Sequence, residues 1–137
     1  MELGHWQLSP TLLSENKEEM PYGFVYEITN LVDGKKYIGK KQCQHVKKLR
    51  PLKGKKNKRH QIAETDWKSY TSSSDKLNAD IEKHGKENFK FEILMWGYSK
   101  SDLSYKEAKL QFDNDVLLCD NYYNGIINIR LSKIKTN

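Results

Sequence analysis

Apolar and polar residues alternate with a period of two over residues 23–30. Phe24, Tyr26 and Ile28 occupy one side of this pattern, and Val25 lies on the other. Strict alternation of this kind is typical of a β-strand that packs on a core. The segment therefore predicts one strand of a sheet.

A hairpin is predicted directly after this strand. Asp33-Gly34 separates it from a second β-prone run at residues 36–39, and Asp-Gly between two such runs is a strong signal for a tight turn. Ten residues lie between Tyr26 and Tyr37, so the hairpin sets the two phenols side by side on neighbouring strands. Residues 89–95 alternate at first and then become apolar, which predicts a third, central strand.

Two helices are predicted between and after these strands. The first begins at the serine run 72–74 and extends to His84, with Gly85 as its stop. Ser72 and Asp75 approximate a capping box.

The second helix is predicted over residues 103–119. One stripe at helical spacing contains Ala108, Phe112, Val116 and Cys119. An adjacent stripe contains Glu107 at a position where a leucine is expected. A buried carboxylate is costly without a partner, so either a cation satisfies Glu107 or its side chain reaches solvent at the edge of the stripe.

These elements predict an α+β domain in which a small three-stranded antiparallel sheet is flanked by helices. A chain of 137 residues with 36% hydrophobic residues fits one domain. We expect a polar N-terminal arm at 1–20 in which Trp6 packs, a domain at 21–131 and a tail at 132–137. No window resembles a membrane span or an export signal, so we expect a cytoplasmic protein with no membrane partner.

Positive charge is concentrated in one quarter of the chain. Residues 35–60 contain ten Lys, two Arg and no acid, whereas the whole chain has 24 basic and 18 acidic residues. The remainder therefore has 12 basic and 18 acidic residues, a net charge of −6. Such focusing is the electrostatic footprint of a nucleic-acid-binding protein, although a solvated loop or a localisation signal is the alternative.

The basic segment 40–62 is predicted as an insertion. Pro51 and Gly54 would break a long helix, so we expect a short helix or turn at 43–50 and a flexible loop at 51–62. Cys43 and Cys119 have no metal-ligand spacing and fit reduced thiols. Trp67 and Tyr70 either cover the core or stack on bases.

The two tyrosine motifs resemble those of the GIY-YIG nuclease superfamily. Its first motif is present in the loosened form Gly23-Phe24-Val25-Tyr26, and its second is intact in Tyr37-Ile38-Gly39. The segment from Ser72 to Gly85 is similar to the middle helix of the phage-type homing endonucleases of this family. The resemblance extends over residues 22–130 and implies a GIY-YIG-like fold.

The resemblance implies a catalytic glutamate at Glu107 and an asparagine at Asn128. Phosphodiester hydrolysis needs an activated water and neutralised phosphate charge. We expect Tyr26 to act as general base, directly or through a hydrogen-bond relay, because neighbouring cations favour phenolate. Tyr37 would position water or phosphate. Asn128 would orient the phosphate or a metal-bound water, or would cap a turn.

The family arginine has two candidates, Arg50 and Arg59. We prefer Arg59, because Arg50 precedes Pro51 and His60 adds a titrating group beside Arg59. His60 would shuttle a proton, bind phosphate or have no role. Further contacts to the DNA backbone are expected from Lys40, Lys41, Lys47, Lys48, Arg50, Lys53, Lys55, Lys56 and Lys58.

The leading interpretation is a Mg²⁺-dependent DNA endonuclease of phage or mobile-element homing type, in the host cytoplasm if phage-encoded. Glu107 would hold one Mg²⁺, with Mn²⁺ as a possible substitute, because Mg²⁺ binds with one or two carboxylates and several waters. The partner is DNA, and the protein is a monomer or a transient homodimer. The alternatives are a restriction-like or structure-specific nuclease, an inactive nucleic-acid-binding module, or an RNA-binding basic protein.

Overall fold

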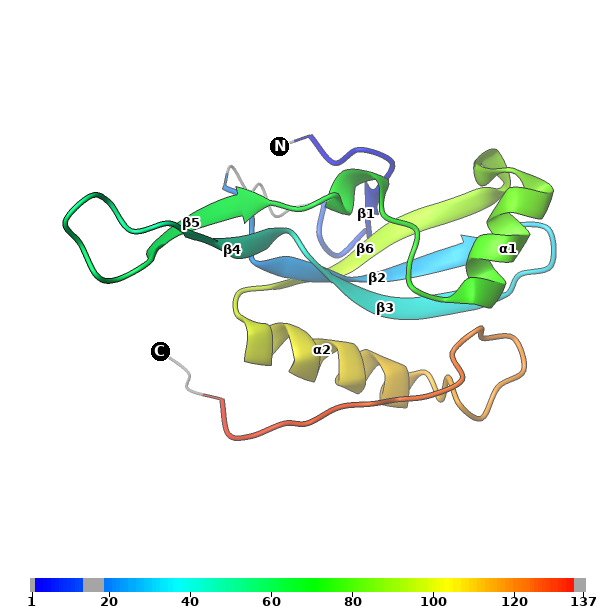
Figure 1. Cartoon of the computed structure of the whole chain (residues 1–137). Coiled ribbons are helices and arrows are strands. Elements are labelled where there is room, and N and C mark those ends of the chain that lie inside the picture. Colours follow the sequence, from blue (N-terminus) through cyan, green and yellow to red (C-terminus); the bar gives the residue numbers. More distant parts are fainter. Residues whose placement is uncertain (1, 14–18, 135–137) are drawn as a thin grey trace.

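A four-stranded sheet in the order β1–β6–β2–β3 forms the centre of the fold (Figure 1). The computed structural model describes residues 2–13 and 19–134; parts of the predicted arm and tail therefore lie outside the described residues. The strands of this sheet are β1 (Gln7–Leu8), β2 (Gly23–Asn30), β3 (Lys36–Gln42) and β6 (Phe89–Gly97). β2 pairs antiparallel with β3, as predicted, and with β6 on its other side, so β2 rather than β6 is the middle one of the three predicted strands. The expected three-stranded sheet is extended by β1, which pairs parallel with β6.

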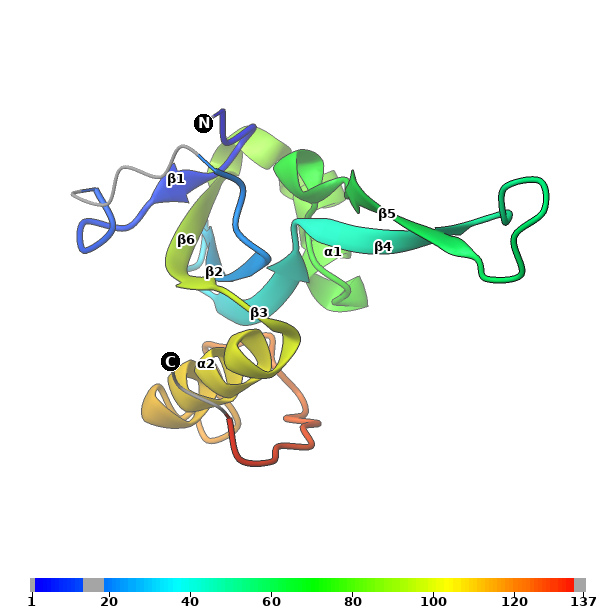
Figure 2. The same ribbon diagram turned by 90° about the vertical axis from the view of Figure 1, so that its left-hand side faces the viewer.

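The two faces of this sheet pack on different layers because the side chains of β2 alternate. Phe24 and Ile28 are fully buried in a cluster that includes Leu77 of α1 (Asp75–His84). Val25 is buried on the other side against Leu103 of α2 (Lys100–Asp113). Figure 2 shows α1 and α2 on opposite sides of the sheet.

The N-terminal segment completes the first cluster. Trp6 is 3% exposed, contacts Phe24 and Tyr26 edge-on or tilted, and donates its indole N–H to the Trp67 carbonyl at 2.6 Å. Trp67, in the 3₁₀ turn η1 (Trp67–Ser69), is itself fully buried. Trp6 and Trp67 are therefore packing residues, as expected.

The predicted helices form, with two corrections at their ends. Ser74 caps α1 by accepting from the Leu77 N–H, so the approximate capping box of Ser72 with Asp75 does not form. A second 3₁₀ turn, η2 (Lys86–Asn88), follows α1.

Helix α2 ends at Asp113 rather than at Cys119. Asp115 adopts a left-handed φ of 51°, which a continuing α-helix does not allow. Of the predicted apolar stripe, Val116 is buried, whereas Phe112 and Cys119 are exposed.

The basic insertion forms a second sheet, where a helix or turn and a loop were expected. β4 (Gln44–Leu49) and β5 (Arg59–Glu64) pair as an antiparallel hairpin. The prediction was wrong because Pro51 and Gly54 lie in the connection between two strands, where Gly54 supplies a φ of +84°. The hairpin projects from the body in both views, and its ends meet where the Thr65 N–H donates to the Cys43 carbonyl at 3.0 Å (Figures 1 and 2).

No helix in the described part of the chain is both long enough and apolar enough to cross a membrane.

Candidate active site

The two motif tyrosines lie together, as the hairpin predicted. Tyr26 on β2 is paired with Gly39 on β3, and Tyr37 is paired with Ile28. The phenols are therefore diagonal neighbours across two strands, and their ring centroids are 6.2 Å apart. Tyr26 is 1% exposed, whereas Tyr37 is only partly buried and forms the accessible side of the pair.

Gly39 provides the space that both rings occupy. A Cβ atom at this position would lie 2.6 Å from the Tyr26 hydroxyl oxygen and 2.8 Å from Cε1 of Tyr37. Ordinary contacts between carbon atoms are about 3.5–4.0 Å. The glycine of the second motif is therefore explained by the close approach of the two phenols.

A third phenol, Tyr70, joins this pair from the segment before α1. Its ring stands edge-on to Tyr26 at 6.2 Å, and it contributes to the raised pKa of Tyr26. Lys41 places its Nζ atom 4.2 Å from the centre of the Tyr70 ring and forms an ion pair of 2.8 Å with Asp66. Tyr70 thus contacts Tyr26 and Lys41. These contacts account for an aromatic residue at position 70 without stacking on bases.

Burial controls the protonation of the phenols. The pKa of Tyr26 is raised well above 10, first by desolvation and then by Tyr37, Tyr70 and Glu107. The pKa of Tyr37 is also raised by desolvation, although a hydrogen bond with Ser73 opposes this shift. The expectation that neighbouring cations favour phenolate is therefore wrong for the protein alone, in which both tyrosines are neutral at neutral pH.

Glu107 reaches β3 from α2, beside Lys40. Its side chain is 17% exposed, and its Oε1 atom lies 4.0 Å from Nζ of Lys40. Desolvation raises the pKa of Glu107, while the Lys40 ammonium and backbone N–H lower it. Glu107 in turn raises the pKa of Tyr26 and Tyr37, so the carboxylate interacts electrostatically with both phenols.

The residues present fit a divalent ion that keeps most of its own waters. Within the described part of the chain no three His, Cys, Asp or Glu residues form a ligand cluster. Glu107 is a half-buried carboxylate whose nearest ammonium is at the 4.0 Å limit of an ion pair, so a further cation would relieve its desolvation. Mg²⁺ suits such a site because one carboxylate, waters and a phosphate oxygen complete its octahedron.

Side chains from α2 and the C-terminal turn cover the outer edge of β3. The Asn124 side chain accepts from the Ile38 N–H at 3.1 Å and donates to the Ile38 carbonyl at 2.8 Å. Gln111 donates to the same carbonyl at 3.0 Å. Both side chains are buried. Sequence reasoning missed Asn124 and chose Asn128, which is exposed on the following segment; the buried pairing with Ile38 spans 86 residues and leaves no local signal.

The structure does not bring the arginine candidates to the tyrosines. Arg59 begins β5 and donates its Nε–H to the Arg50 carbonyl at 3.2 Å, so both lie at the outer end of the projecting hairpin (Figure 1). His60, next on β5, is exposed and lies opposite Lys48. Lys40 and Lys41 are the predicted basic residues that lie at the phenols and Glu107.

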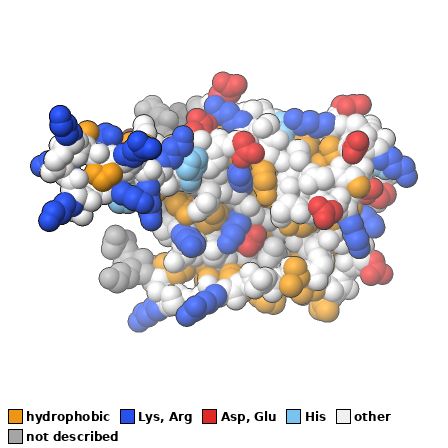
Figure 3. Space-filling model, viewed as in Figure 1, with side chains coloured by type: hydrophobic (Ala, Val, Ile, Leu, Met, Phe, Trp, Pro, Cys, Tyr) orange, Lys and Arg blue, Asp and Glu red, His pale blue; other side chains and the backbone are white. Residues whose placement is uncertain are grey.

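The other predicted phosphate contacts follow the hairpin and its tip. Figure 3 shows Lys and Arg side chains over the projecting end, with the acidic side chains over the body. The set comprises Lys47, Lys48, Arg50, Lys53, Lys55, Lys56 and Lys58, which are all exposed.

Comparison with known proteins agrees with this arrangement. Residues 6–127 match the family model described as "Putative endonuclease segE, GIY-YIG domain". The chain is also 29% identical, over 103 residues, to the protein of Enterobacteria phage T4 described as "Putative endonuclease segE". The aligned region is 75% of this chain but 40% of segE, so the chain spans less than half of that relative. No solved structure matches the chain. The family match covers most of the chain and contains both tyrosine motifs and Glu107, and the protein therefore belongs to the segE-type GIY-YIG endonuclease family.

Proposed function

We propose that the protein is a metal-dependent DNA endonuclease that hydrolyses phosphodiester bonds, of the homing type found in phages and mobile elements. The observations that support this proposal are the paired rings of Tyr26 and Tyr37 and the electrostatic interaction of both phenols with Glu107. A module that only binds DNA has no use for a desolvated carboxylate beside its phosphate-binding surface, because that carboxylate repels phosphate.

Tyr26 acts through hydrogen bonds in this proposal. A buried phenol with a pKa well above 10 is a hydrogen-bond donor at neutral pH, and the Tyr26 ring contacts the ring of Tyr70. The more accessible Tyr37 is the phenol that orients water or a phosphate oxygen. Deprotonation of Tyr26 would require added positive charge, because Tyr37, Tyr70 and Glu107 all raise its pKa.

The basic side chains at the site supply charge for the phosphate. Lys40 lies between Glu107 and Ser104, to whose hydroxyl its Nζ donates at 2.8 Å. Lys41 projects from the same side of β3 as Tyr37, because alternate residues of a strand share a face. We assign Lys41, on the tyrosine side of β3, and Lys40, on the Glu107 side, to the scissile phosphate in place of Arg50 or Arg59.

Glu107 is the residue that would hold the divalent ion, with Mg²⁺ as the preferred ion and Mn²⁺ as a substitute. Bound there, the ion would neutralise charge on the phosphate and on the departing 3′ oxygen. Asn124 supports the site indirectly, because it fixes the backbone of Ile38 between Tyr37 and Gly39.

Cleavage of supercoiled plasmid tests this function. Wild-type protein and Glu107→Gln are incubated with the plasmid in Mg²⁺ or EDTA, with Glu87→Gln, an exposed glutamate on η2, as the matched control. We expect nicked or linear product from wild type and Glu87→Gln in Mg²⁺ alone. Cleavage by Glu107→Gln at the wild-type rate would refute the assignment, and retarded but intact DNA with every protein would indicate a binding module.

A further inference from the structure

The β4–β5 hairpin is a two-stranded ribbon that projects from the body and contacts it at its base, where the Gln44 side chain donates to the Met20 carbonyl at 2.8 Å (Figure 1). It has six cross-strand pairs, and most of its side chains are exposed. An isolated two-stranded hairpin is only marginally stable in water. A projecting hairpin of this length therefore suggests that it contacts a partner. Its continuity with β3, through Cys43 alone, places its base directly beside the catalytic edge.

Its charge identifies a polyanion as the partner. Residues 44–63 contain eight Lys or Arg and no acid. A face that is only solvated usually mixes both signs, as residues 75–92 of this chain do.

Its uncharged side chains indicate contact with bases as well as phosphates. Val46 and Ile62 lie opposite each other and are 60% and 67% exposed. The neighbouring cross-strand pair joins Lys47 to Gln61, and His45 is also exposed. Side-chain amides such as that of Gln61 can read base edges, and apolar side chains contact the thymine methyl group. Phosphate binding alone would not use an exposed apolar pair.

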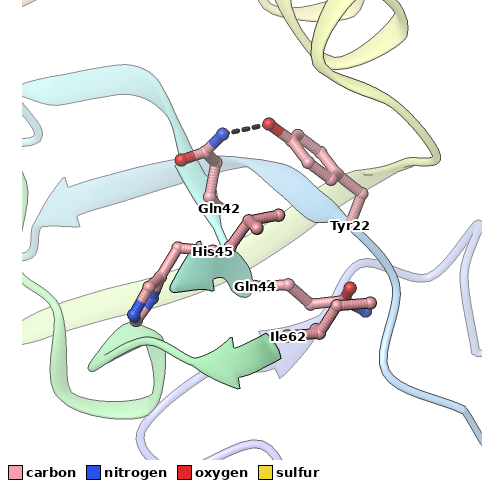
Figure 4. A pocket seen from close by; sticks show the side chains of 6 residues that line it. Tyr22, Gln42, Gln44, His45 and Ile62 are labelled. Carbon is pink, nitrogen blue, oxygen red and sulfur yellow. Dashed lines mark hydrogen bonds between the residues drawn. The ribbon is translucent and has the colours of Figure 1, made fainter. Parts of the chain in front are cut away.

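The apolar pair also borders a hollow of about 340 Å³ at the base of the hairpin, lined by Tyr22 and Gln42 on the body side (Figure 4). The Gln42 side chain donates to the Tyr22 hydroxyl, which joins the start of β2 to the end of β3. The exposed apolar surface therefore continues from the ribbon toward the site.

We propose that the β4–β5 hairpin lies in the major groove of duplex DNA and contacts base edges on one side of the scissile phosphate. This inference rests on the proposed function, which supplies the cleavage position. The width of the ribbon favours the major groove. Its strands are about 4.8 Å apart before side chains are added, which suits a groove about 12 Å wide and is too broad for one of about 6 Å. Duplex RNA is excluded by its deep, narrow major groove.

The length of the ribbon sets its reach. Strand β4 has six residues. At about 3.4 Å per residue it extends about 20 Å, and duplex DNA rises about 3.4 Å per base pair. Base preference should therefore extend about six base pairs from the cut, on one side only.

Binding without cleavage tests the groove. Glu107→Gln protein is titrated onto a 30-base-pair duplex by fluorescence anisotropy, with methyl green as the major-groove competitor and netropsin as the minor-groove competitor. We expect methyl green to weaken binding about tenfold or more and netropsin to change it less than about twofold. Competition by netropsin alone, or equal affinity for the single strand, would overturn the proposal.

A matched pair of lysine variants locates the contact. Lys47→Ala with Lys48→Ala should weaken binding and lower the salt slope by about two, as two lost phosphate contacts require. Lys76→Ala with Lys83→Ala removes the same charge from exposed positions on α1 and should leave the slope unchanged. Equal effects of both pairs would overturn the proposal, because charge alone would then explain binding.

Sequencing the ends from a partial digest of mixed-sequence DNA tests the base contacts. Wild-type ends should show preference within about six base pairs on one side of the cut. Val46→Ser with Ile62→Ser should reduce this preference about fivefold. Leu118→Ser with Ile126→Ser, also exposed apolar residues, serves as control and should not.

Symmetric preference, or preference untouched by the hairpin variant while circular dichroism shows it folded, would overturn the proposal. If wild type binds with methyl-green sensitivity and cuts nothing, the endonuclease is refuted while the groove contact stands.

Discussion

Gly39→Ala is the substitution whose effect follows most directly from the structure. The added Cβ would lie 2.6 Å from the Tyr26 hydroxyl oxygen and 2.8 Å from Tyr37. Restoring ordinary contact at about 3.5 Å requires the rings to move by roughly 1 Å. Overpacking of this kind costs about 1–3 kcal/mol, and the lower backbone entropy of alanine in the unfolded chain offsets up to about 1 kcal/mol. A displacement of about 1 Å at a catalytic site lowers the rate about 100-fold.

The plasmid assay and urea unfolding separate these two effects. We expect Gly39→Ala to lose up to about 2 kcal/mol of stability and about 100-fold in cleavage rate, with DNA affinity within about twofold. Gly125→Ala is the control, because a Cβ there meets nothing within 4 Å. Cleavage by Gly39→Ala within about threefold of the Gly125→Ala rate would show that the reaction does not depend on the positions of the two phenols.

Three further predictions use the protonation and hydrogen bonds of the site. Glu107→Gln should abolish cleavage and raise the melting temperature at pH 8, because burial raises the pKa of the carboxyl group and makes its ionised form destabilising. The gain in melting temperature should vanish near pH 4, below the pKa of the group in the unfolded chain. A gain that persists at pH 4 would contradict this argument. Tyr26→Phe should slow cleavage without changing affinity. Because the folded pKa of Tyr26 is raised, it contributes stability below about pH 10 that is lost as pH rises further, and Tyr26→Phe should show a smaller loss in alkaline melts. Asn124→Ala should lower the free energy of unfolding by about 2 kcal/mol, because the Ile38 N–H loses its hydrogen-bond acceptor. The control Asn128→Ala, at an exposed position, should change it by less than about 0.5 kcal/mol. Equal losses for the two variants in urea unfolding would contradict the role of Asn124.

Short-range patterns predicted most of the main sheet and both helices. Asp33-Gly34 and the alternation around Tyr26 gave the hairpin, and the serine run gave the start of α1. The parallel pairing of β1 was missed because two residues, Gln7 and Leu8, are too few for a periodic signal.

The predictions that failed depended on information that local sequence does not contain. The ribbon β4–β5 has no buried side, so its strands lack the apolar alternation by which strands are recognised. Glu107 was proposed because the family resemblance implies a catalytic glutamate there and because a charged residue interrupts an apolar stripe at this position. The hydrogen bonds between Asn124 and Ile38 have no such local signal. Arg59 lies far from the tyrosines because it belongs to a hairpin whose polar composition predicted a loop.

Both ends of the β4–β5 hairpin leave the body at one place, so the hairpin could be replaced as a unit. Its two ends are joined by the hydrogen bond between Thr65 and Cys43, so the length of chain between them does not alter the geometry of the body. Adding cross-strand pairs costs little loop-closure entropy, because that cost grows only with the logarithm of length. Under the proposed contact of the hairpin with DNA, a graft between residues 43 and 65 would transfer target recognition and leave the tyrosines and Glu107 in place.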